Sequence, residues 1–235
     1  MPLELLAWED VDFEVFPELM WRSFKDDLMG VMYPNGYSEA DREQTARSRQ
    51  KKEQKHSDES KWMKVIDTDL PADDPLRGIV SAAHWHFYLN ERTDAELDAA
   101  SDMAKKKDPS EKETPPPGLN KEFAEEFFGA LEKYRRDIMG GKPYILLHIL
   151  VVRPSHQRRG IGGMHLRWGE EQADKLGMPM YLESSPMGRG LYERHGYEKV
   201  TDLPVDCRKY GHSKALTHTC MLRPAKTVAA TTKPA

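Results

Sequence analysis

Cysteine is scarce in this chain of 235 residues, which holds only Cys207 and Cys220. Neither residue belongs to a C-x-x-C pair or to a histidine-rich cluster, so the sequence offers no disulfide framework, no zinc-binding pattern and no redox motif. We therefore expect no metal cofactor.

Long apolar segments are also missing. No run approaches the roughly 20 residues that cross a bilayer, and the first residues, from Met1 to Glu4, show no basic stretch leading into an apolar one. The absence of both signals predicts a cytoplasmic protein without a membrane partner.

An excess of positive charge is absent as well. The 35 lysines and arginines are outnumbered by 39 acidic residues, which gives a formal net charge of −4. Proteins that bind nucleic acid usually present a strongly basic face, so this balance argues against a nucleic-acid partner. The length is sufficient for one well-buried α/β domain with appendages.

The most informative stretch of the chain runs from Tyr144 to Gly177. A β-branched apolar run, residues 145–152, ends at Pro154 and is followed by a basic, glycine-rich turn and then by a helical pattern over residues 162–176. Glycines at such a turn either cap a helix or let backbone N–H groups cradle a phosphate. A Walker A loop and the G-x-G-x-x-G dinucleotide fingerprint both fail to match.

The turn reads Gln157-Arg158-Arg159-Gly160-Ile161-Gly162, and this order resembles the Q/R-x-x-G-x-G/A motif of the GNAT superfamily of N-acetyltransferases. The segment Met180 to Val200 is similar to the fifth strand, fourth helix and sixth strand of that superfamily. Within it, the residues from Leu191 to Tyr197 resemble the common L-Y-x-x-x-G-F/Y signature. More narrowly, the chain resembles fungal GNAT-type acetyltransferases of unassigned substrate.

This resemblance implies an α/β fold with a mixed, mostly antiparallel central sheet, in which strands four and five splay apart and helices cover both faces. We expect a single GNAT-like domain over residues 1–223. Residues 91–118 are too polar and proline-rich to bury a core and form a predicted flexible insertion. Residues 224–235 form a predicted disordered tail.

Periodicity and breaker residues predict the other elements. Strands are expected at 3–7, 62–67, 78–89 and 217–222, helices at 15–28 and 119–139, turns at 29–37 and 201–204, and a solvated helix or surface loop at 38–61. The strand at 78–89 places His84 and His86 on one face and Trp85 and Phe87 on the other. The histidine face is either part of a site or the half-exposed side of an antiparallel strand.

The superfamily transfers an acetyl group from acetyl-CoA to an amine by direct attack in a ternary complex. Carried over by position, the pyrophosphate of acetyl-CoA, the expected cosubstrate, is held by the loop. Strand backbone faces the pantetheine, and Ser185 stands where relatives often carry Asn. The implied CoA-binding residues are Leu150, Val152, Gln157, Arg158, Arg159, Gly160, Ile161, Gly162, Gly163 and Ser185.

Acetylation of an alkylamine requires a base or a water chain, because removing a proton from an amine of pKa near 10.4 costs roughly 4 kcal/mol at neutral pH, whereas an arylamine would need neither. His148 is the first candidate, since its strand is similar to the histidine-containing strand of arylalkylamine N-acetyltransferases, with Glu183, His84 and His86 in reserve. Tyr192, in the L-Y-x-x-x-G-Y segment, is expected to protonate the departing thiolate. The alternatives are core packing for His148 and packing against CoA for Tyr192.

The leading functional hypothesis is an acetyl-CoA-dependent N-acetyltransferase, an acyltransferase enzyme, acting on a small-molecule amine. A second hypothesis is acetylation of protein lysines or N-termini. A third is a non-catalytic acyl-CoA-binding module, which the presence of Tyr192 disfavours.

The predicted insertion generates a first test. Replacing residues 99–116 with a short Gly/Ser linker is expected to leave a folded protein that binds acetyl-CoA, because a segment of this composition contributes little to a core. Calorimetric titration with acetyl-CoA and thermal melting measure the outcome. Loss of cooperative melting in the shortened chain would contradict the prediction.

Overall fold

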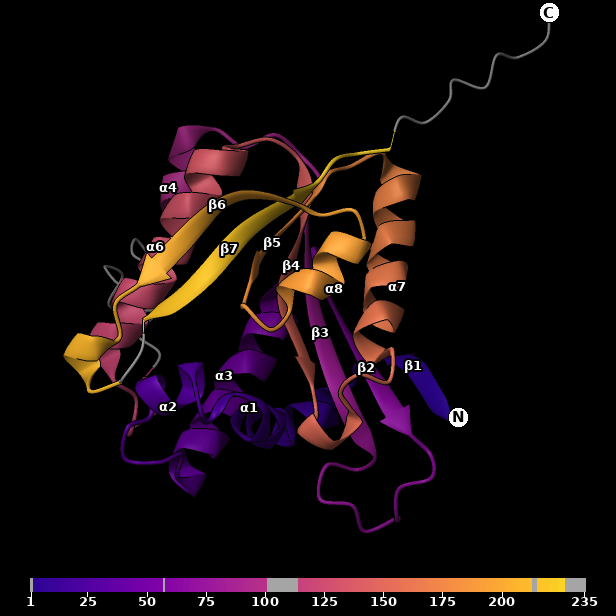
Figure 1. The fold of residues 1–235 in the computed structure, drawn as a ribbon, viewed down its shortest axis with the longest axis vertical. Helices are drawn as coiled ribbons and strands as arrows, with labels where there is room; N and C mark the ends of the chain where they lie inside the picture. The colour runs from indigo at the N-terminus through magenta and orange to yellow at the C-terminus, as the bar shows by residue number, and fades with distance from the viewer. Residues whose placement is uncertain (1, 57, 101–113, 213–214, 227–235) are drawn as a thin grey trace, which may run out of the picture.

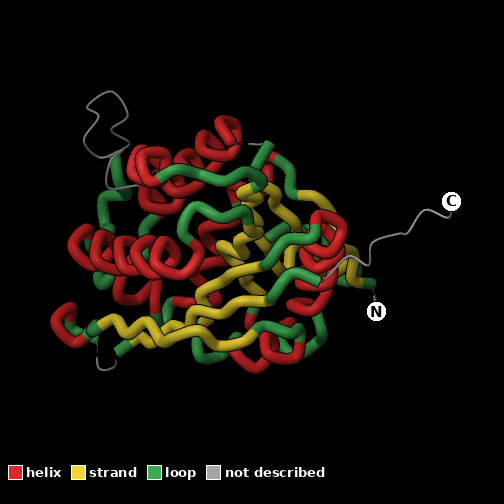
Figure 2. Tube along the Cα trace, turned by 90° about the horizontal axis from the view of Figure 1, so that it is seen from above, coloured by secondary structure: helices red, strands yellow, loops and turns green. Residues whose placement is uncertain are grey.

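A seven-stranded sheet with helices on both faces forms the centre of the computed structural model, which describes residues 2–56, 58–100, 114–212 and 215–226 (Figures 1 and 2). The strands lie in the order β1-β2-β3-β4-β5-β7-β6, and only β4 and β5 run parallel. The predicted mixed, mostly antiparallel α/β fold is confirmed.

The strands are β1 (Leu3–Ala7), β2 (Ser60–Asp67), β3 (Ile79–Tyr88), β4 (Tyr144–Val152), β5 (Met180–Ser184), β6 (Glu198–Val205) and β7 (Leu216–Arg223). The α-helices are α1 (Phe16–Phe24), α2 (Leu28–Met32), α3 (Glu39–His56), α4 (Asp94–Ala100), α6 (Lys121–Met139), α7 (Ile161–Leu176) and α8 (Arg189–Arg194). Short 3-10 helices lie at Asp10–Glu14, Pro154–His156 and Arg208–Tyr210.

The two faces of the sheet carry separate cores. On one face, α7 and α8 pack against β3, β4 and β5 around Trp85, Leu147 and Leu182. On the other face, α6 packs over Tyr144, Leu146 and Tyr181, while α1 packs over a neighbouring cluster on β2 and β3. Because alternate strand residues face opposite ways, β4 contributes buried side chains to both cores, as its nearly continuous apolar sequence requires.

One turn prediction was wrong, and a second was right only in part. Residues 201–204 belong to β6, where Leu203 and Val205 are buried and Pro204 pairs with Thr217. This strand lies at the edge of the sheet, where a proline without an N–H group is tolerated. The turn predicted within 29–37 is present around Pro34 and Asn35, where the Gly36 N–H donates to the Tyr33 carbonyl at 3.0 Å, but residues 29–32 belong to helix α2, whose first amide is capped by the Asp27 side chain.

The insertion predicted at 91–118 includes helix α4 and residues 101–113. The tail predicted at 224–235 consists largely of residues 227–235. Residues 101–113 and 227–235 lie outside the described residues, so the flexible insertion and the disordered tail stay predictions. In the described part of the chain, no helix is both long and apolar enough to span a bilayer.

The approach of α7 to the sheet depends on one glycine. A methyl group at Gly169 would overlap the indole of Trp85 on β3. We expect Gly169→Ala to lower the free energy of unfolding by about 1–3 kcal/mol, the usual cost of overpacking a core.

Gly129 on α6 is the matched control, because a methyl group there would meet no atom within 4 Å. Gly129→Ala is expected to raise the free energy of unfolding by up to about 1 kcal/mol through helix propensity alone. Urea unfolding of both variants measures the difference. Equal effects of the two substitutions would contradict close packing of α7 on Trp85.

Candidate functional site

The pairing between β4 and β5 stops halfway along the two strands. Ile145, Leu146 and Leu147 pair with Met180, Tyr181 and Leu182, and no pair follows. From His148 to Val152, the edge of β4 that faces β5 therefore has no strand partner in the described part of the chain. Unpaired strand N–H and C=O groups need acceptors and donors, and an extended ligand can supply both. The predicted splay of strands four and five is present.

A β-bulge marks the start of this open edge. Ile149 pairs with His84 and Leu147 pairs with Trp85, which leaves His148 as the extra residue on β4. A bulge puts two consecutive side chains on one face of a strand. His148 and Ile149 therefore both face the α6 side of the sheet, whereas Leu147 and Leu150 pack on the α7 side.

Beyond β4, the chain turns sharply into α7. Arg158 has φ 59° and Gly160 has φ 81°, so two left-handed residues bend the loop before the helix begins at Ile161. Among the described residues, no acceptor is paired with the amides of Gly160, Ile161, Gly162 and Gly163. Amides at the start of a 16-residue helix carry the positive end of its dipole, so the loop fits an anionic group such as a phosphate.

Gly162 has a packing role in addition to its predicted contact with the cosubstrate. A Cβ atom at this position would lie 2.7 Å from Leu191 Cδ2 on α8 and 3.8 Å from Leu150 Cδ2 on β4. The start of α7 therefore closes over the open edge of β4 together with α8. A side chain at position 162 would require the end of the Leu191 side chain to shift.

Two side chains of the predicted loop are directed elsewhere. Gln157 Nε2 donates to the carbonyl of Val152 at 3.2 Å and so closes the end of β4. Arg159 Nη1 lies 3.3 Å from Asp67 Oδ2 at the end of β2. The CoA-binding roles predicted for these residues and for Val152 stay predictions. Within the motif, the backbone amides of residues 160–163 are the groups that have no hydrogen-bond acceptor among the described residues.

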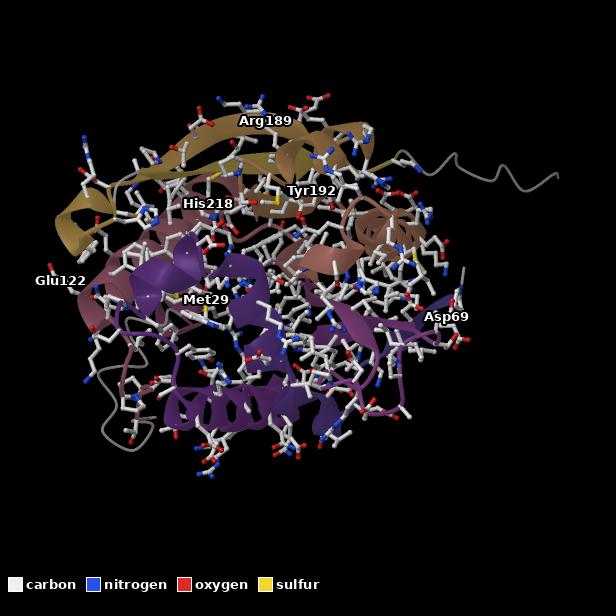
Figure 3. The ribbon with its side chains drawn as sticks, turned by 60° about the horizontal axis from the view of Figure 1, so that its bottom comes forward. Met29, Asp69, Glu122, Arg189, Tyr192 and His218 are labelled. Atoms are coloured by element: carbon white, nitrogen blue, oxygen red, sulfur yellow. The ribbon has the colours of Figure 1, made fainter. Side chains whose placement is uncertain are left out.

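Tyr192 lies on the α7 face, next to the open end of β5. Its ring packs so closely against Gly188 that a Cβ atom there would lie 2.8 Å from Tyr192 Cε2 and 3.3 Å from Ser184 Oγ. Figure 3 shows Tyr192 within the outline of the molecule and Arg189, from the same helix, at its rim. Burial raises the pKa of the Tyr192 phenol, so it stays protonated at neutral pH.

Ser185, the residue after β5, turns the chain back toward α8. Its carbonyl accepts a hydrogen bond from the Gly188 N–H at 3.1 Å and from Ser184 Oγ at 2.7 Å. The residue therefore lies near the foot of Tyr192, and its predicted contact with CoA stays a prediction.

On the opposite face, a cavity of about 250 Å³ lies between α6 and strands β3 and β4. Its lining includes His84, His86, Tyr88, Arg92, Leu131, Arg135, Tyr144 and His148. The strand alternation that was predicted to put His84 and His86 on one face is confirmed, and His148 joins them. Within the described residues, these histidines belong to no group of three or more ligands able to hold a metal ion.

A chain of hydrogen bonds fixes the tautomer of His84. Ser60 Oγ donates to Glu53 Oε2 at 2.7 Å, and the same hydroxyl lies 2.7 Å from His84 Nε2. Because the serine proton goes to the carboxylate, His84 Nε2 must carry the proton that Ser60 accepts. His84 Nδ1, which has no partner among the described residues, is left as a buried acceptor.

Both inner histidines are neutral at pH 7. Burial and the neighbouring His148 lower the pKa of His84 well below 6.5, and burial together with the charge of Arg135 does the same for His148. Their rings meet edge to face at 5.4 Å. The cavity therefore contains two imidazoles able to accept a proton.

Glu183, the third predicted catalytic residue, also faces the α6 side but is held in an ion pair. Its two carboxylate oxygens accept hydrogen bonds from Arg135 Nε and Nη2 at 3.1 Å each, and the glutamate side chain is only 6% exposed. This bidentate geometry favours a structural role for Glu183 and leaves the histidines as the better-placed bases.

The sequence analysis did not identify the arginines that line the cavity or the hydrogen bonds from Ser60 to Glu53 and His84. Arg92, Arg135 and Ser60 stand in segments with no motif, and only the fold brings them to the cavity. Arg135 lies three residues before Ile138 on the polar flank of a predicted amphipathic helix, which is a pattern shared by ordinary surface arginines.

The comparisons with known proteins agree with this geometry. A family profile described as acetyltransferase (GNAT) domain matches residues 124–199, which run from within α6 through the loop and α8. A probable acyltransferase, SID5 from Ajellomyces capsulatus, is 34% identical over 88 residues. Residues 124–199 therefore match a GNAT acetyltransferase domain, and part of the chain is similar to an acyltransferase.

The SID5 match covers 37% of this chain and 59% of that relative, so it spans less than two thirds of the relative's length. Among solved structures, arylalkylamine N-acetyltransferase 2 from Aedes aegypti aligns over 96% of this chain and 100% of its own, with TM-score 0.62 and 10% identity. A Corynebacterium glutamicum protein described as histone acetyltransferase HPA2 and related acetyltransferase aligns over 98% and 100%, with TM-score 0.56 and 16% identity. At these identities the structures show the GNAT fold alone.

The ion pair of Glu183 generates a prediction. Glu183→Gln leaves the guanidinium of Arg135, which is only 17% exposed, without its carboxylate. The free energy of unfolding is expected to fall by about 2–3 kcal/mol, as it does when one partner of a largely buried pair is removed.

Asp137→Asn on the same helix, α6, is the control, because the pair of Asp137 with Lys133 is exposed and is expected to contribute less than about 1 kcal/mol. Urea unfolding distinguishes the two variants. A Glu183→Gln protein that melts like the unmodified chain but has lost turnover would instead identify Glu183 as the base.

Proposed function

We propose that the protein is an acetyl-CoA-dependent N-acetyltransferase that transfers an acetyl group directly to the amine of a small molecule. The observation that carries the proposal is the open edge of β4 beyond Leu147, with Tyr192 beside it on one face of the sheet and the histidine-lined cavity on the other. The proposal thus puts the donor on the α7 face of the sheet and the acceptor on the α6 face.

The residues of the α7 side fit acetyl-CoA. The unpaired amides from Gly160 to Gly163 are suited to its pyrophosphate, and the unpaired edge of β4 at Leu150 is suited to its pantetheine amides. Acetyl-CoA supplies the thioester carbonyl carbon and a thiolate leaving group. No residue of the described chain has to form a covalent intermediate in a direct transfer.

The acceptor amine must lose a proton as the new C–N bond forms. His148, at the bulge, is the base that we propose, because it lines the cavity at the point where the open edge begins. A neutral imidazole with a lowered pKa is a weak base for a free ammonium group. It is sufficient once bond formation makes the nitrogen acidic. Nδ1 of His84 is then a second acceptor for the proton, and the Nε2 atom of the same ring is hydrogen-bonded to Ser60, which in turn donates to Glu53.

The size of the cavity favours a small acceptor over a protein. At about 250 Å³ it is smaller than the sites that enclose drug-sized ligands, and it lies beneath a helix. The non-catalytic module is disfavoured because neutral histidines and a protonated tyrosine border the open edge from opposite faces.

Release of free thiol from acetyl-CoA, followed with a panel of small amines and basic peptides, tests the proposal directly. We expect thiol release with at least one small amine and none above background with peptides. Acetyl-CoA binding without thiol release for any acceptor would support the module, and release with peptides alone would support the protein acetyltransferase.

Tyr192→Phe is expected to lower kcat by ~10²-fold or more while leaving acetyl-CoA affinity nearly unchanged. A tyrosine of pKa near 10 is a weaker acid than a thiol of pKa near 8.5, and burial raises the pKa of Tyr192 further. The phenol therefore acts as a hydrogen-bond donor to the departing thiolate.

Tyr197→Phe is the control, because its hydroxyl contacts only the sulfur of Met180, at 3.5 Å, and the ring stays buried. Steady-state kinetics and calorimetry separate turnover from binding. If Tyr192→Phe weakens acetyl-CoA binding and turns over normally at saturation, Tyr192 is a packing residue.

A further inference from the structure

The cavity on the α6 side contains one arginine whose charge is not balanced by a carboxylate. Three arginines line it. Arg135 is paired with Glu183, and Arg136 is paired with Asp94 and Asp98 on α4. Arg92 forms no ion pair with any described residue.

The nearest acids are otherwise engaged or out of reach. Glu96 lies close enough to feel the charge of Arg92, but its carboxylate accepts hydrogen bonds from the N–H and Oγ of Thr93 at 2.7 and 2.8 Å. Glu132 lines the same cavity from α6 and is not within ion-pair distance of Arg92. Among the described residues, Arg92 therefore interacts with the Tyr144 side chain but has no carboxylate partner.

Arg92 is held in place by its backbone and by stacking. Its N–H donates to the carbonyl of Gly141 at 2.9 Å, and Gly141 lies so close to the Arg92 carbonyl that any side chain at 141 would overlap it. Its guanidinium carbon lies 3.7 Å from the centre of the Tyr88 ring and 5.8 Å from that of Tyr144. A guanidinium held over an aromatic ring is oriented before any ligand arrives.

The Nε atom of Arg92 is buried without an acceptor among the described residues. A buried donor that lacks an acceptor destabilises the protein, and a carboxylate bound at the terminal Nη atoms of Arg92 would balance the charge of the same guanidinium in a charge-assisted contact. The structure thus assigns an acid-binding position to this end of the cavity.

We propose that the acceptor is an amine that also carries a carboxylate, and that Arg92 binds the carboxylate. This inference rests on the proposed function. Tyr88 pairs with Tyr144 beside Arg92, and His84 and His148 lie four residues further along the two strands. Four strand residues span on the order of 13 Å, so the reacting amine and the carboxylate are separated by several methylene groups. The class is an ω-amino carboxylate rather than an amino acid that reacts at its own α-amine.

The test compares 6-aminohexanoate with hexylamine, which has the same chain without the acid, and with hexane-1,6-diamine. We expect kcat/KM for 6-aminohexanoate to exceed that for hexylamine by about tenfold or more, as for a charge-assisted bidentate contact. Arg92→Gln is expected to lower kcat/KM for 6-aminohexanoate about tenfold more than that for hexylamine, and cooperative thermal melting shows that the variant is folded. Arg92→Lys is expected to keep part of the preference.

Lys133→Gln is the charge-matched control, since Lys133 lies on α6, is exposed and pairs with Asp137 outside the cavity. It is expected to leave the preference unchanged. Equal turnover of 6-aminohexanoate and hexylamine, or equal loss of both in Arg92→Gln, would overturn the proposal. A preference for hexane-1,6-diamine would indicate that the acidic Glu132, which also lines the cavity, binds the far end of the acceptor, and it would overturn the proposal as well.

Direct binding separates this inference from the proposed function. If no amine is acetylated, calorimetry with 6-aminohexanoate shows whether the cavity binds it in an Arg92-dependent way. Such binding without turnover would retain the acid site and reject the acetyltransferase, whereas neither binding nor turnover would reject both.

Discussion

The candidate site depends on the place where β4 and β5 stop pairing. A parallel pair that continued beyond Leu147 and Leu182 would satisfy the backbone of β4 and leave nothing for a ligand to bind. The bulge at His148 acts at the same point, because it turns this side chain toward the α6 face. The end of the β4–β5 pairing thus leaves one edge of β4 unpaired, and the bulge at the same point directs His148 toward the α6 face.

The two faces then provide different chemistry. The α7 side combines left-handed loop residues, unpaired amides and a protonated phenol, all of which suit an anionic ligand with a leaving thiolate. The α6 side combines neutral imidazoles with an arginine that has no carboxylate partner among the described residues. Neutral histidines persist beside arginines because burial and the nearby positive charge both disfavour the imidazolium form.

Much of the α7 side was predictable because its signals are local. A β-branched run, a proline and closely spaced glycines define strand, turn and helix within about 20 residues, and Tyr192 follows in a recognisable segment. The α6 side was predictable only in part. Strand alternation placed His84 beside His86, but the addition of His148 depends on a bulge that no periodic pattern reveals. Glu183 was predicted as a reserve base without any sign of its partner Arg135.

The sequence by itself indicated most of the strands and helices, the glycine-rich turn before α7 and the resemblance to the GNAT superfamily, because each of these signals comes from residues close in the chain. Tertiary structure decided which polar side chains share the cavity. Arg92 lies before α4, Arg135 on α6, His84 on β3 and His148 on β4, and their meeting depends on sheet register and helix packing. Such long-range contacts leave no trace in local composition, since an arginine that faces a cavity and one that faces water have the same neighbours in sequence.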